Sequence, residues 1–324
     1  MLAVFADSIN SEDPLAGLVV GDRPEPQVPD GWTLVTVKAA SLNHHDVFSL
    51  RGVGLPADRL PMILGCDAAG FDEDGNEVLV HAVISDPSWQ GDETLDPRRS
   101  LLSERFQGTL AERVAVPRRN VVPKPASLSF EQAACLPTAW LTAYRMLFTQ
   151  SGLRPGDTVL VQGAGGGVST ALIALASAAG MRVFATSRDE AKRARALDLG
   201  AHEAVPPGTR LPSRVDAVME TVGAATWRHS MTSLRPGGTL VVSGMTSGAV
   251  PESPELTRLF FLQLRVQGST MGTRDELAGL AEFLDLSGVR PVIDRVLPLA
   301  EARAGLAAMI DGELFGKVVL TLPG

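Results

Sequence analysis

A run of glycines between an apolar strand and a helix is the segment of this chain best suited to bind a phosphate. Thr158–Gln162 is short, apolar and β-branched, Gly163–Gly167 forms a turn, and apolar residues then recur at helical spacing. Glycines let the backbone approach phosphate oxygens, and the unpaired N–H groups and dipole at a helix start favour an anion. A bare glycine run can be an ordinary loop, but strand, turn and helix together follow the fingerprint that binds a dinucleotide pyrophosphate.

A second group of polar residues, Asn43-His44-His45-Asp46, is suited to proton transfer. An imidazole can donate or accept a proton near neutral pH, and a fixed donor can stabilise a developing oxyanion. A lone histidine is usually structural, but two of the five histidines are adjacent here. The pattern leaves a catalytic and a structural interpretation open.

Two kinds of pattern surround these residues. The N-terminal part contains short strand-like runs separated by Pro and Gly clusters, at Thr33–Ala39, Glu77–Val83 and Ala111–Pro117. From Thr158 onward strands alternate with helical stretches, which predicts an α/β doubly wound parallel sheet. Its expected strands are Thr158–Gln162, Arg182–Thr186, Val215–Met219, Thr239–Ser243 and Leu264–Gln267.

The remaining segments are expected to complete the first domain. Helices over about Asp275–Leu286 and Ala300–Asp311 precede a last strand, Lys317–Thr321. Ser85–Glu104 has no clear period and is expected to be a loop or lid beside the active site.

Composition excludes several classes of protein. The chain has 324 residues, 45% hydrophobic and 20% charged, which indicates a globular protein of two domains. A net charge of −8 argues against a nucleic-acid partner. Only two cysteines occur, and no signal peptide or long apolar stretch is found, so a cytoplasmic protein with no membrane contact is expected.

An ordered set of motifs resembles the medium-chain dehydrogenase/reductase superfamily. The motifs are NHHD (43–46), GCDAAG (65–70), GTLAE (108–112), LPTAWLTAY (136–144), the glycine turn and GKVVL (316–320). The chain is most similar to the zinc-independent, quinone oxidoreductase-like branch, often called zinc-binding alcohol dehydrogenase-like. The resemblance implies a GroES-like, β-rich catalytic domain (1–124 and 269–324) interrupted by a Rossmann NADP-binding domain (125–268), with the active site between them.

The resemblance also bears on metal binding. Where zinc-dependent relatives hold the catalytic metal with Cys, His and Cys, this chain has Asn43, Cys66 and Thr138. A tetrahedral zinc site needs three soft or imidazole ligands, and of these three residues only Cys66 provides one. The four cysteines of the structural-zinc lobe are also missing. We expect no metal; the alternative is an improvised site of Cys66 with His44, His45 or Asp67.

The end of the second Rossmann strand favours NADPH. Where an NAD enzyme places an acid on the ribose, the matching residue is Ser187, followed by Arg188 and, one helical turn later, Lys192. Serine and arginine can bind a 2′-phosphate that a carboxylate would repel. Asp189 argues against NADPH: if its carboxylate, rather than Ser187, points at the ribose, NADH would compete with NADPH.

The resemblance assigns the other cofactor contacts. His44 and Lys317 match positions that face the pyrophosphate in relatives, although Lys317 can equally be a strand-edge lysine. The turns after later strands are expected to lie along adenosine and nicotinamide, and Ser269 and Met271 to hold the carboxamide. The full expected set is His44, Thr142, Gly165, Gly166, Gly167, Val168, Ser187, Arg188, Lys192, Thr221, Val222, Gly223, Ser243, Gly244, Met245, Ser269, Met271 and Lys317.

Without a metal, hydride transfer needs an acceptor that is already electrophilic, such as a quinone or an α,β-unsaturated carbonyl. Asn43 and His45 are the candidate donors to the carbonyl oxygen, with Asp46 beside them, and His45 can supply the proton. Relatives often have a tyrosine where this chain has Phe48, which weakens a simple transfer of the quinone mechanism. The sequence therefore predicts an NADPH-dependent quinone or enone reductase.

Two other functions stay open. One is a zinc-dependent alcohol dehydrogenase with atypical ligands, and the other is a non-catalytic NADPH-binding sensor, because one scaffold hosts many activities. Relatives often dimerise through Rossmann sheet edges, so a homodimer is expected through Thr239–Gly244 and the segment toward Phe260–Phe261.

Overall fold

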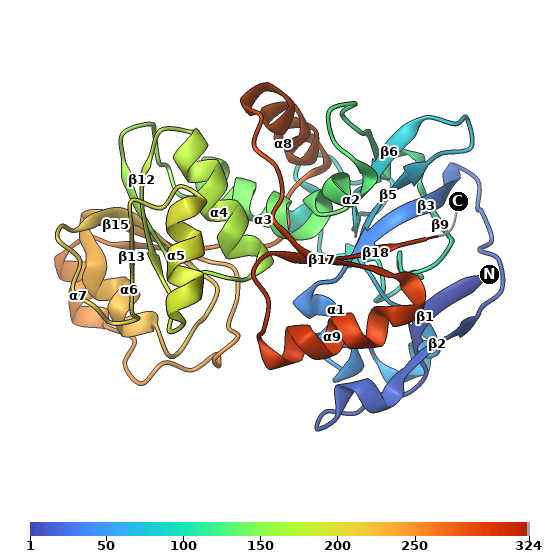
Figure 1. Ribbon diagram of the computed structural model, residues 1–324, viewed down its shortest axis with the longest axis horizontal. Coiled ribbons are helices and arrows are strands. Elements are labelled where there is room, and N and C mark those ends of the chain that lie inside the picture. Colours follow the sequence, from blue (N-terminus) through green and yellow to red (C-terminus); the bar gives the residue numbers. More distant parts are fainter. Residues whose placement is uncertain (323–324) are drawn as a thin grey trace. The chain divides into compact units, whose positions relative to one another are not determined.

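The computed structural model describes residues 1–322, which form two compact units. The first consists of residues 1–141 with the segment from Met271 onward, and the second consists of Thr142–Thr270 (Figure 1). Segment 125–141 lies in the first unit, which differs from the domain boundary expected at residue 125. The reason is packing: the helices of this segment contact strands of the first unit's sheet.

The first unit contains a seven-stranded sheet in the order β10-β6-β5-β3-β18-β17, with β9 also paired to β3. Its long strand β3 is antiparallel to β5, β9 and β18. A three-stranded antiparallel sheet, β2-β1-β4, and the pair β7-β8 complete the unit. The strands are β1 Leu2–Ala6, β2 Leu18–Asp22, β3 Trp32–Ser41, β4 Met62–Ile63, β5 Asp67–Phe71, β6 Glu77–Val80, β7 Val83–Ile84, β8 Ser100–Leu101, β9 Arg113–Pro117, β10 Val121–Pro123, β17 Ile293–Pro298 and β18 Lys317–Thr321.

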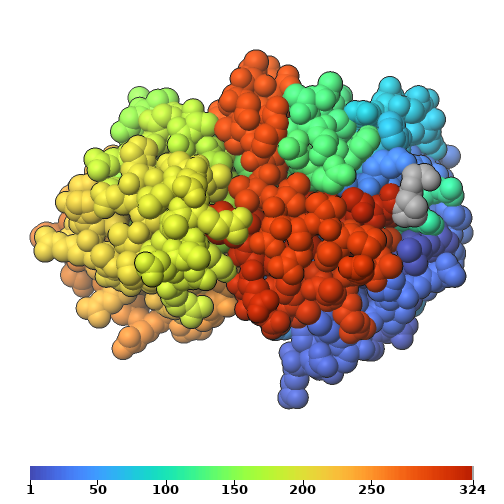
Figure 2. All heavy atoms as spheres, viewed as in Figure 1, coloured from blue at the N-terminus to red at the C-terminus, as the bar shows by residue number. Residues whose placement is uncertain are grey.

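The C-terminal segment is built into this sheet. Strand β18 lies between β3 and β17, so residues far apart in the sequence are hydrogen-bonded neighbours. In the space-filling view the red C-terminal atoms and the blue N-terminal atoms of this unit share one surface (Figure 2). The unit's helices are α1 His44–Leu50, α2 Phe130–Ala133, η5 Leu136–Trp140, α8 Arg274–Ser287 and α9 Ala302–Asp311, with short 3-10 turns η1 Pro14–Gly17, η2 Ala57–Arg59, η3 Glu93–Leu95, η4 Arg118–Asn120 and η7 Leu299–Glu301.

The second unit is a six-stranded, fully parallel sheet in the order β13-β12-β11-β14-β15-β16. Helices α4 and α5 pack against β11–β13, and α6 packs against β14 and β15 (Figure 1). This arrangement confirms the doubly wound α/β fold. Its elements are α3 Leu141–Tyr144, η6 Arg145–Gln150, β11 Thr158–Val161, α4 Gly167–Ala178, β12 Arg182–Thr186, α5 Glu190–Asp198, β13 Glu203–Val205, β14 Val215–Glu220, α6 Trp227–Ser233, β15 Leu234–Val242, α7 Leu256–Phe261 and β16 Arg265–Gly268.

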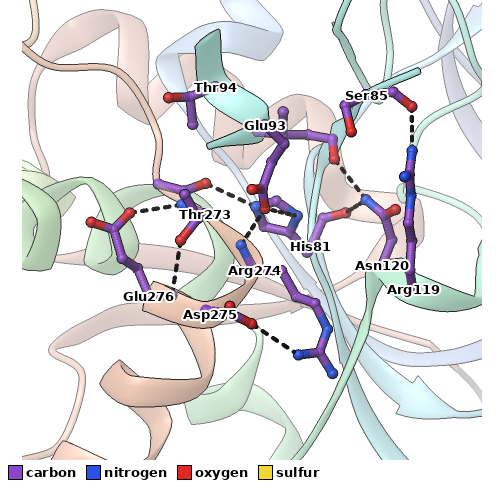
Figure 3. Close-up of polar contacts among 12 residues, drawn as sticks. His81, Ser85, Glu93, Thr94, Arg119, Asn120, Thr273, Arg274, Asp275 and Glu276 are labelled. Atoms are coloured by element: carbon purple, nitrogen blue, oxygen red, sulfur yellow. Dashed lines mark hydrogen bonds and ion pairs between the residues drawn. The ribbon is translucent and has the colours of Figure 1, made fainter. Parts of the chain in front are cut away.

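The segment Ser85–Glu104 has more order than a loop without structure. It contains η3, and β8 pairs with β7. The Glu93 carboxylate accepts a hydrogen bond from the backbone N–H of Arg274, at the start of α8, and lies 3.8 Å from Nδ1 of the buried His81. Figure 3 shows Glu93, His81 and Arg274 together. His81 donates through Nε2 to the carbonyl of Gly272 at 2.9 Å. The middle of the segment is therefore fastened to the first turn of α8.

Candidate functional site

Helix α1 begins with a hydrogen-bond pattern that explains Asp46. The carboxylate of Asp46 accepts from the backbone N–H of Asn43 at 2.8 Å and from that of Gly65 at 2.9 Å. The side chain is fully buried, and burial raises the pKa of this carboxyl. A buried acid that closes a helix start and ties down the next loop is structural. These contacts give Asp46 a structural role and do not support the catalytic role expected of it.

Asn43 and Lys317 belong to a buried cluster around Asp67. The ammonium of Lys317, only 3% exposed, donates to Asn43 Oδ1 at 2.6 Å, to the carbonyl of Leu42 at 2.7 Å and to Asp67 Oδ2 at 3.2 Å. The amide of Asn43 donates to Asp67 Oδ2 at 2.9 Å and to the carbonyl of Ser41 at 3.4 Å. The three N–H bonds of an ammonium and the two of an amide are thus directed to protein acceptors.

These contacts correct two expectations. Lys317 has its donors turned inward, so the geometry gives no support to a pyrophosphate contact. Asn43 has both amide N–H bonds engaged, so it is not placed as a free donor to a substrate oxygen. Both side chains instead balance the buried carboxylate of Asp67, because a buried charge is tolerated only when it is paired and hydrogen-bonded.

His45 is the residue of this motif with both a polar environment and access to solvent. Its side chain is 19% exposed. Nε2 donates to Oε1 of Glu104 at 3.1 Å. On the other side of the ring, Nδ1 lies 3.5 Å from Sγ of Cys66 and 3.4 Å from Oγ of Ser103. The structure therefore brings His45 together with a carboxylate that the sequence did not single out.

The electrostatics of this cluster favour a charged His45. Burial acts to lower the pKa of His45, whereas the hydrogen bond to Glu104 and the charge of Asp46 act to raise it; the charge of Cys66 raises it only where that group is a thiolate. For Glu104, burial acts to raise the pKa, and the hydrogen bonds from His45 and from the Leu101 N–H lower it overall. Burial raises the pKa of the Cys66 thiol, so this thiol is neutral at pH 7. The cluster is a histidine–carboxylate pair beside a neutral thiol.

The residues at the positions of zinc ligands in related enzymes do not fit a zinc ion. Asn43 is engaged with Asp67 and Lys317, and Thr138 offers a hydroxyl whose oxygen is buried without a hydrogen-bond partner. Among residues 1–322, no group of three or more His, Cys, Asp or Glu side chains is arranged to hold a metal ion. His44, the other histidine of the motif, is exposed on α1, with its ring 6.4 Å from that of Phe48.

In the second unit, the glycine turn lies among the turns that follow neighbouring strands. Gly166 is the N-cap of α4, and Gly165 has a φ of +132°, a conformation open to glycine. A Cβ at Gly163 would lie 2.7 Å from Val222. One at Gly223 would lie 2.9 Å from the Cα of Met245. The structure thus brings together the turns at Gly163–Gly167, Thr221–Gly223 and Ser243–Met245, as expected at the carboxyl edge of a parallel sheet.

The turn after β12 resolves the position of Asp189. Its carboxylate accepts from the backbone N–H of Lys192 at 3.1 Å and so caps helix α5. Ser187 is buried, and its hydroxyl accepts from the Asp189 N–H at 3.2 Å, while Arg188 is exposed. Asp189 therefore caps helix α5 through one of its two carboxylate oxygens. Arg193, not singled out from the sequence, donates to the carbonyls of Ser187 and Arg188.

Two further features bear on cofactor binding. The buried carboxylate of Glu220 accepts from the N–H groups of Val222 and Gly223, at 2.8 and 2.9 Å, and so shapes that turn. The hydroxyl of Ser269 is buried without a hydrogen-bond partner in the protein, so it could form a hydrogen bond with a bound ligand. Thr142 and Met271 are both buried, and Met271 has a φ of +49°.

The sequence missed Glu104 and Glu220 as members of the site. Glu104 lies 59 residues after His45 in a segment without periodicity, and Glu220 is the last residue of an apolar strand. A charged residue at the end of an otherwise apolar strand was an available signal for Glu220. Glu104 had no comparable signal.

The two units together define the class of this protein: a GroES-like, strand-rich unit combined with a Rossmann unit. Residues 29–126 match the family described as alcohol dehydrogenase GroES-like domain, and residues 167–285 match zinc-binding dehydrogenase. The chain belongs to the medium-chain dehydrogenase/reductase superfamily, a family of oxidoreductases.

Relatives within this superfamily carry different names. The chain is 31% identical to a zinc-type alcohol dehydrogenase-like protein, YogA, from Leptosphaeria maculans, over 89% of this chain and 90% of that protein. It is 27% identical to an acryloyl-coenzyme A reductase from Metallosphaera sedula, over 94% and 96% of the two chains.

Similar solved structures also include both alcohol dehydrogenases and enoyl-CoA carboxylase/reductases. An NAD-dependent alcohol dehydrogenase shares 35% identity with a TM-score of 0.92, covering 100% of both chains. The 2-octenoyl-CoA carboxylase reductase CinF, solved with NADP and 2-octenoyl-CoA, shares 25% identity with a TM-score of 0.90, covering 99% of this chain and 87% of that one. Over residues 1–322, no helix is long and apolar enough to cross a membrane.

Proposed function

We propose that this protein is an NADPH-dependent reductase of α,β-unsaturated carbonyl compounds that works without a metal ion. The observation that carries the proposal is the His45–Glu104 pair, a partly exposed imidazolium in the strand-rich unit. The residues at the zinc-ligand positions do not fit a metal, so a proton donor is the electrophilic group that this chain itself supplies. Bound NADPH would supply the hydride.

The named relatives support the substrate class. An acryloyl-coenzyme A reductase and a structure holding 2-octenoyl-CoA both concern a carbon–carbon double bond conjugated to a thioester carbonyl. Hydride addition to the β-carbon of such a group moves negative charge to the carbonyl oxygen, and a proton must then be supplied. We therefore propose enones and enoyl thioesters, rather than quinones, as the preferred substrates.

The cofactor would be held by the second unit's grouped turns. The backbone N–H groups at the first turn of α4 are suited to the pyrophosphate, since the first N–H groups of a helix have no partner within it. The hydroxyl of Ser269 is available for the carboxamide. Ser187 and the exposed Arg188 are suited to the 2′-phosphate of NADPH.

Arg188 provides a direct test of cofactor choice. Arg188→Ala should raise the KM for NADPH about 10-fold or more and leave the KM for NADH within about twofold, because one charge-assisted phosphate contact is removed. Steady-state kinetics with both cofactors measures this. The matched control is Arg195→Ala, an exposed arginine further along α5. An equal loss with both cofactors would remove Arg188 from the proposed phosphate site.

The reaction itself is tested by nicotinamide absorbance. Chelator-treated protein is supplied with NADPH or NADH and a panel of enones, enoyl thioesters and quinones. The proposal expects consumption of NADPH with conjugated carbonyls and no gain on adding zinc. Activity that appears only with zinc and an alcohol or aldehyde would favour the alcohol dehydrogenase, and tight NADPH binding with no turnover would favour the sensor.

We also propose a homodimer, through an edge that differs from the expected one. Strand β15 is paired on both sides, so Thr239–Gly244 is not an edge of the sheet. The edges of the sheet are β13 and β16. The four residues of β16 are exposed, and Phe260 and Phe261, which precede β16 in the chain, are 68% and 76% exposed. An exposed strand edge beside exposed apolar side chains is a pairing surface.

The proposed dimer surface at β16, Phe260 and Phe261 can be tested by substitution. The double variant Phe260→Asp/Phe261→Asp should shift the protein from dimer to monomer in sedimentation velocity, because two charges would be buried on association. Val250→Asp changes another exposed apolar residue of this unit and should leave the dimer intact. A monomeric wild-type protein would contradict the proposed dimer.

A further inference from the structure

We infer that Glu104 is a positioning residue of this enzyme: its carboxylate orients the His45 ring and keeps it in the protonated form that gives a proton to the substrate after hydride transfer. The inference rests on the proposed function and extends it to a residue outside the NHHD motif.

Both ring nitrogens of His45 have hydrogen-bonding partners. On the Nδ1 side, the Cys66 thiol donates to the carbonyl of Leu102 at 3.2 Å, which leaves its sulfur as an acceptor toward the ring. The hydroxyl of Ser103 lies on the same side. On the Nε2 side stands the Glu104 carboxylate. The Ser103 hydroxyl can accept from Nδ1–H or donate to Nδ1, so these partners accommodate the imidazolium, which donates at both nitrogens to Ser103 and to Glu104.

The two sides of the ring differ in access to solvent. Cys66 and Ser103 are buried, whereas the Glu104 side chain is 27% exposed. Nδ1 is therefore the anchored nitrogen, and the proton on Nε2 is the one that can leave. A substrate that approaches this nitrogen would replace part of its bond to Glu104, which is consistent with catalytic hydrogen bonds that rearrange in the substrate complex.

The local backbone holds Glu104 in place. Its second oxygen, Oε2, accepts from the backbone N–H of Leu101 at 3.2 Å. Gly54 approaches the carboxylate closely, since a Cβ there would lie 3.1 Å from Oε1. Ser103, next in the chain to Glu104, has a φ of +66°, a costly conformation for serine. A strained residue is found where the surrounding structure fixes a particular geometry, and here it aims both Ser103 and Glu104 at His45.

The charges around the pair all bear on the same proton. Asp46 on α1 and Glu104 favour the imidazolium, burial opposes it, and Cys66 is a neutral thiol. Burial acts to raise the pKa of Glu104, and the hydrogen bonds from His45 and the Leu101 N–H lower it overall, with a smaller contribution from the charge of Arg99. Because the hydrogen bond to Glu104 acts to raise the pKa of His45, the protonated donor form persists to higher pH than it would without Glu104.

The proton balance of the step is complete. Bound NADPH would supply the hydride for the new C–H bond at the β-carbon, and the electrons of the double bond would move toward the carbonyl oxygen to give an enolate. The Nε2–H bond of His45 breaks, and its proton goes to the enolate. His45 is then neutral and regains a proton from solvent, with Glu104 favouring its return.

The test replaces the charge of Glu104 and keeps its shape. Glu104→Gln keeps one of the two side-chain oxygens as an acceptor, for either His45 or the Leu101 N–H, and a thermal melt checks that the fold is kept. The limb of the kcat profile on which activity falls with rising pH should move to lower pH by about one unit. Glu104→Asp retains the charge, so its kcat profile should lie between those of Glu104→Gln and the wild-type protein. The matched control, Glu93→Gln, removes a carboxylate of the same segment that binds Arg274 and not His45 (Figure 3).

A second readout does not depend on turnover. NMR titration of the His45 ring, assigned among the five histidines with His45→Gln, should show a pKa about one unit lower in Glu104→Gln and an unchanged pKa in Glu93→Gln. An unchanged pKa in Glu104→Gln, or an equal shift in both variants, overturns the inference even if the enzyme reduces enones. A wild-type protein that reduces no conjugated carbonyl defeats the proposed function, and the proton-donor part of the inference with it, while the titration still decides whether Glu104 holds the charge.

Discussion

His45→Ala should lower kcat for enone reduction by about 10²–10⁴-fold while the Kd for NADPH changes by less than about threefold. The imidazolium is the partly exposed proton donor of the first unit, whereas the grouped turns proposed to bind NADPH lie in the second. Loss of the donor should therefore act on the chemical step and leave cofactor binding in place. Turnover by absorbance and NADPH affinity by fluorescence titration measure the two quantities.

The control for His45→Ala is His202→Ala, which removes an exposed imidazole from the second unit and should keep kcat near the wild-type value. A thermal melt of each variant separates lost chemistry from lost folding, because His45 also contacts Cys66 and Ser103. Equal losses of kcat and of NADPH affinity would assign His45 to cofactor binding or to folding, and would contradict its role as the donor.

Lys317→Met should destabilise the first unit by about 3–5 kcal/mol, the cost of leaving a buried charge without its partner. The ammonium has three protein acceptors, and Oδ1 of Asp67 already has no hydrogen-bond partner. Urea unfolding followed by tryptophan fluorescence measures this, since Trp32, Trp89 and Trp140 are in the first unit.

The partner variant makes the cause of that loss testable. Lys317→Met/Asp67→Asn should be more stable than Lys317→Met alone, because the uncompensated charge is gone. Lys38→Met, on strand β3 of the same sheet, is the control and should cost less than about 1 kcal/mol. A stable Lys317→Met protein that has lost NADPH affinity would restore the pyrophosphate role that the buried contacts argue against.

The Rossmann unit was predictable because its signals are local. The strand, glycine turn and helix around Gly163–Gly167 follow one another in the chain, and strand β12 was predicted at Arg182–Thr186 with its observed bounds. Patterns of apolar periodicity and glycine position act over a few residues, so a sequence can reveal them. The short strand β13 was missed because its three residues carry no clear period.

The sequence by itself determined the superfamily, the fold class and which short motif holds the polar residues of the strand-rich unit. Only the tertiary structure decided what each of those residues does. The side chain of Asn43 is hydrogen-bonded to Asp67 and Lys317, and that of Asp46 to the backbone of Gly65. His45 is instead hydrogen-bonded to Glu104. These partners are up to 274 residues away along the chain. The role of a polar side chain depends on which donors, acceptors and charges surround it, and it is folding that brings those groups together.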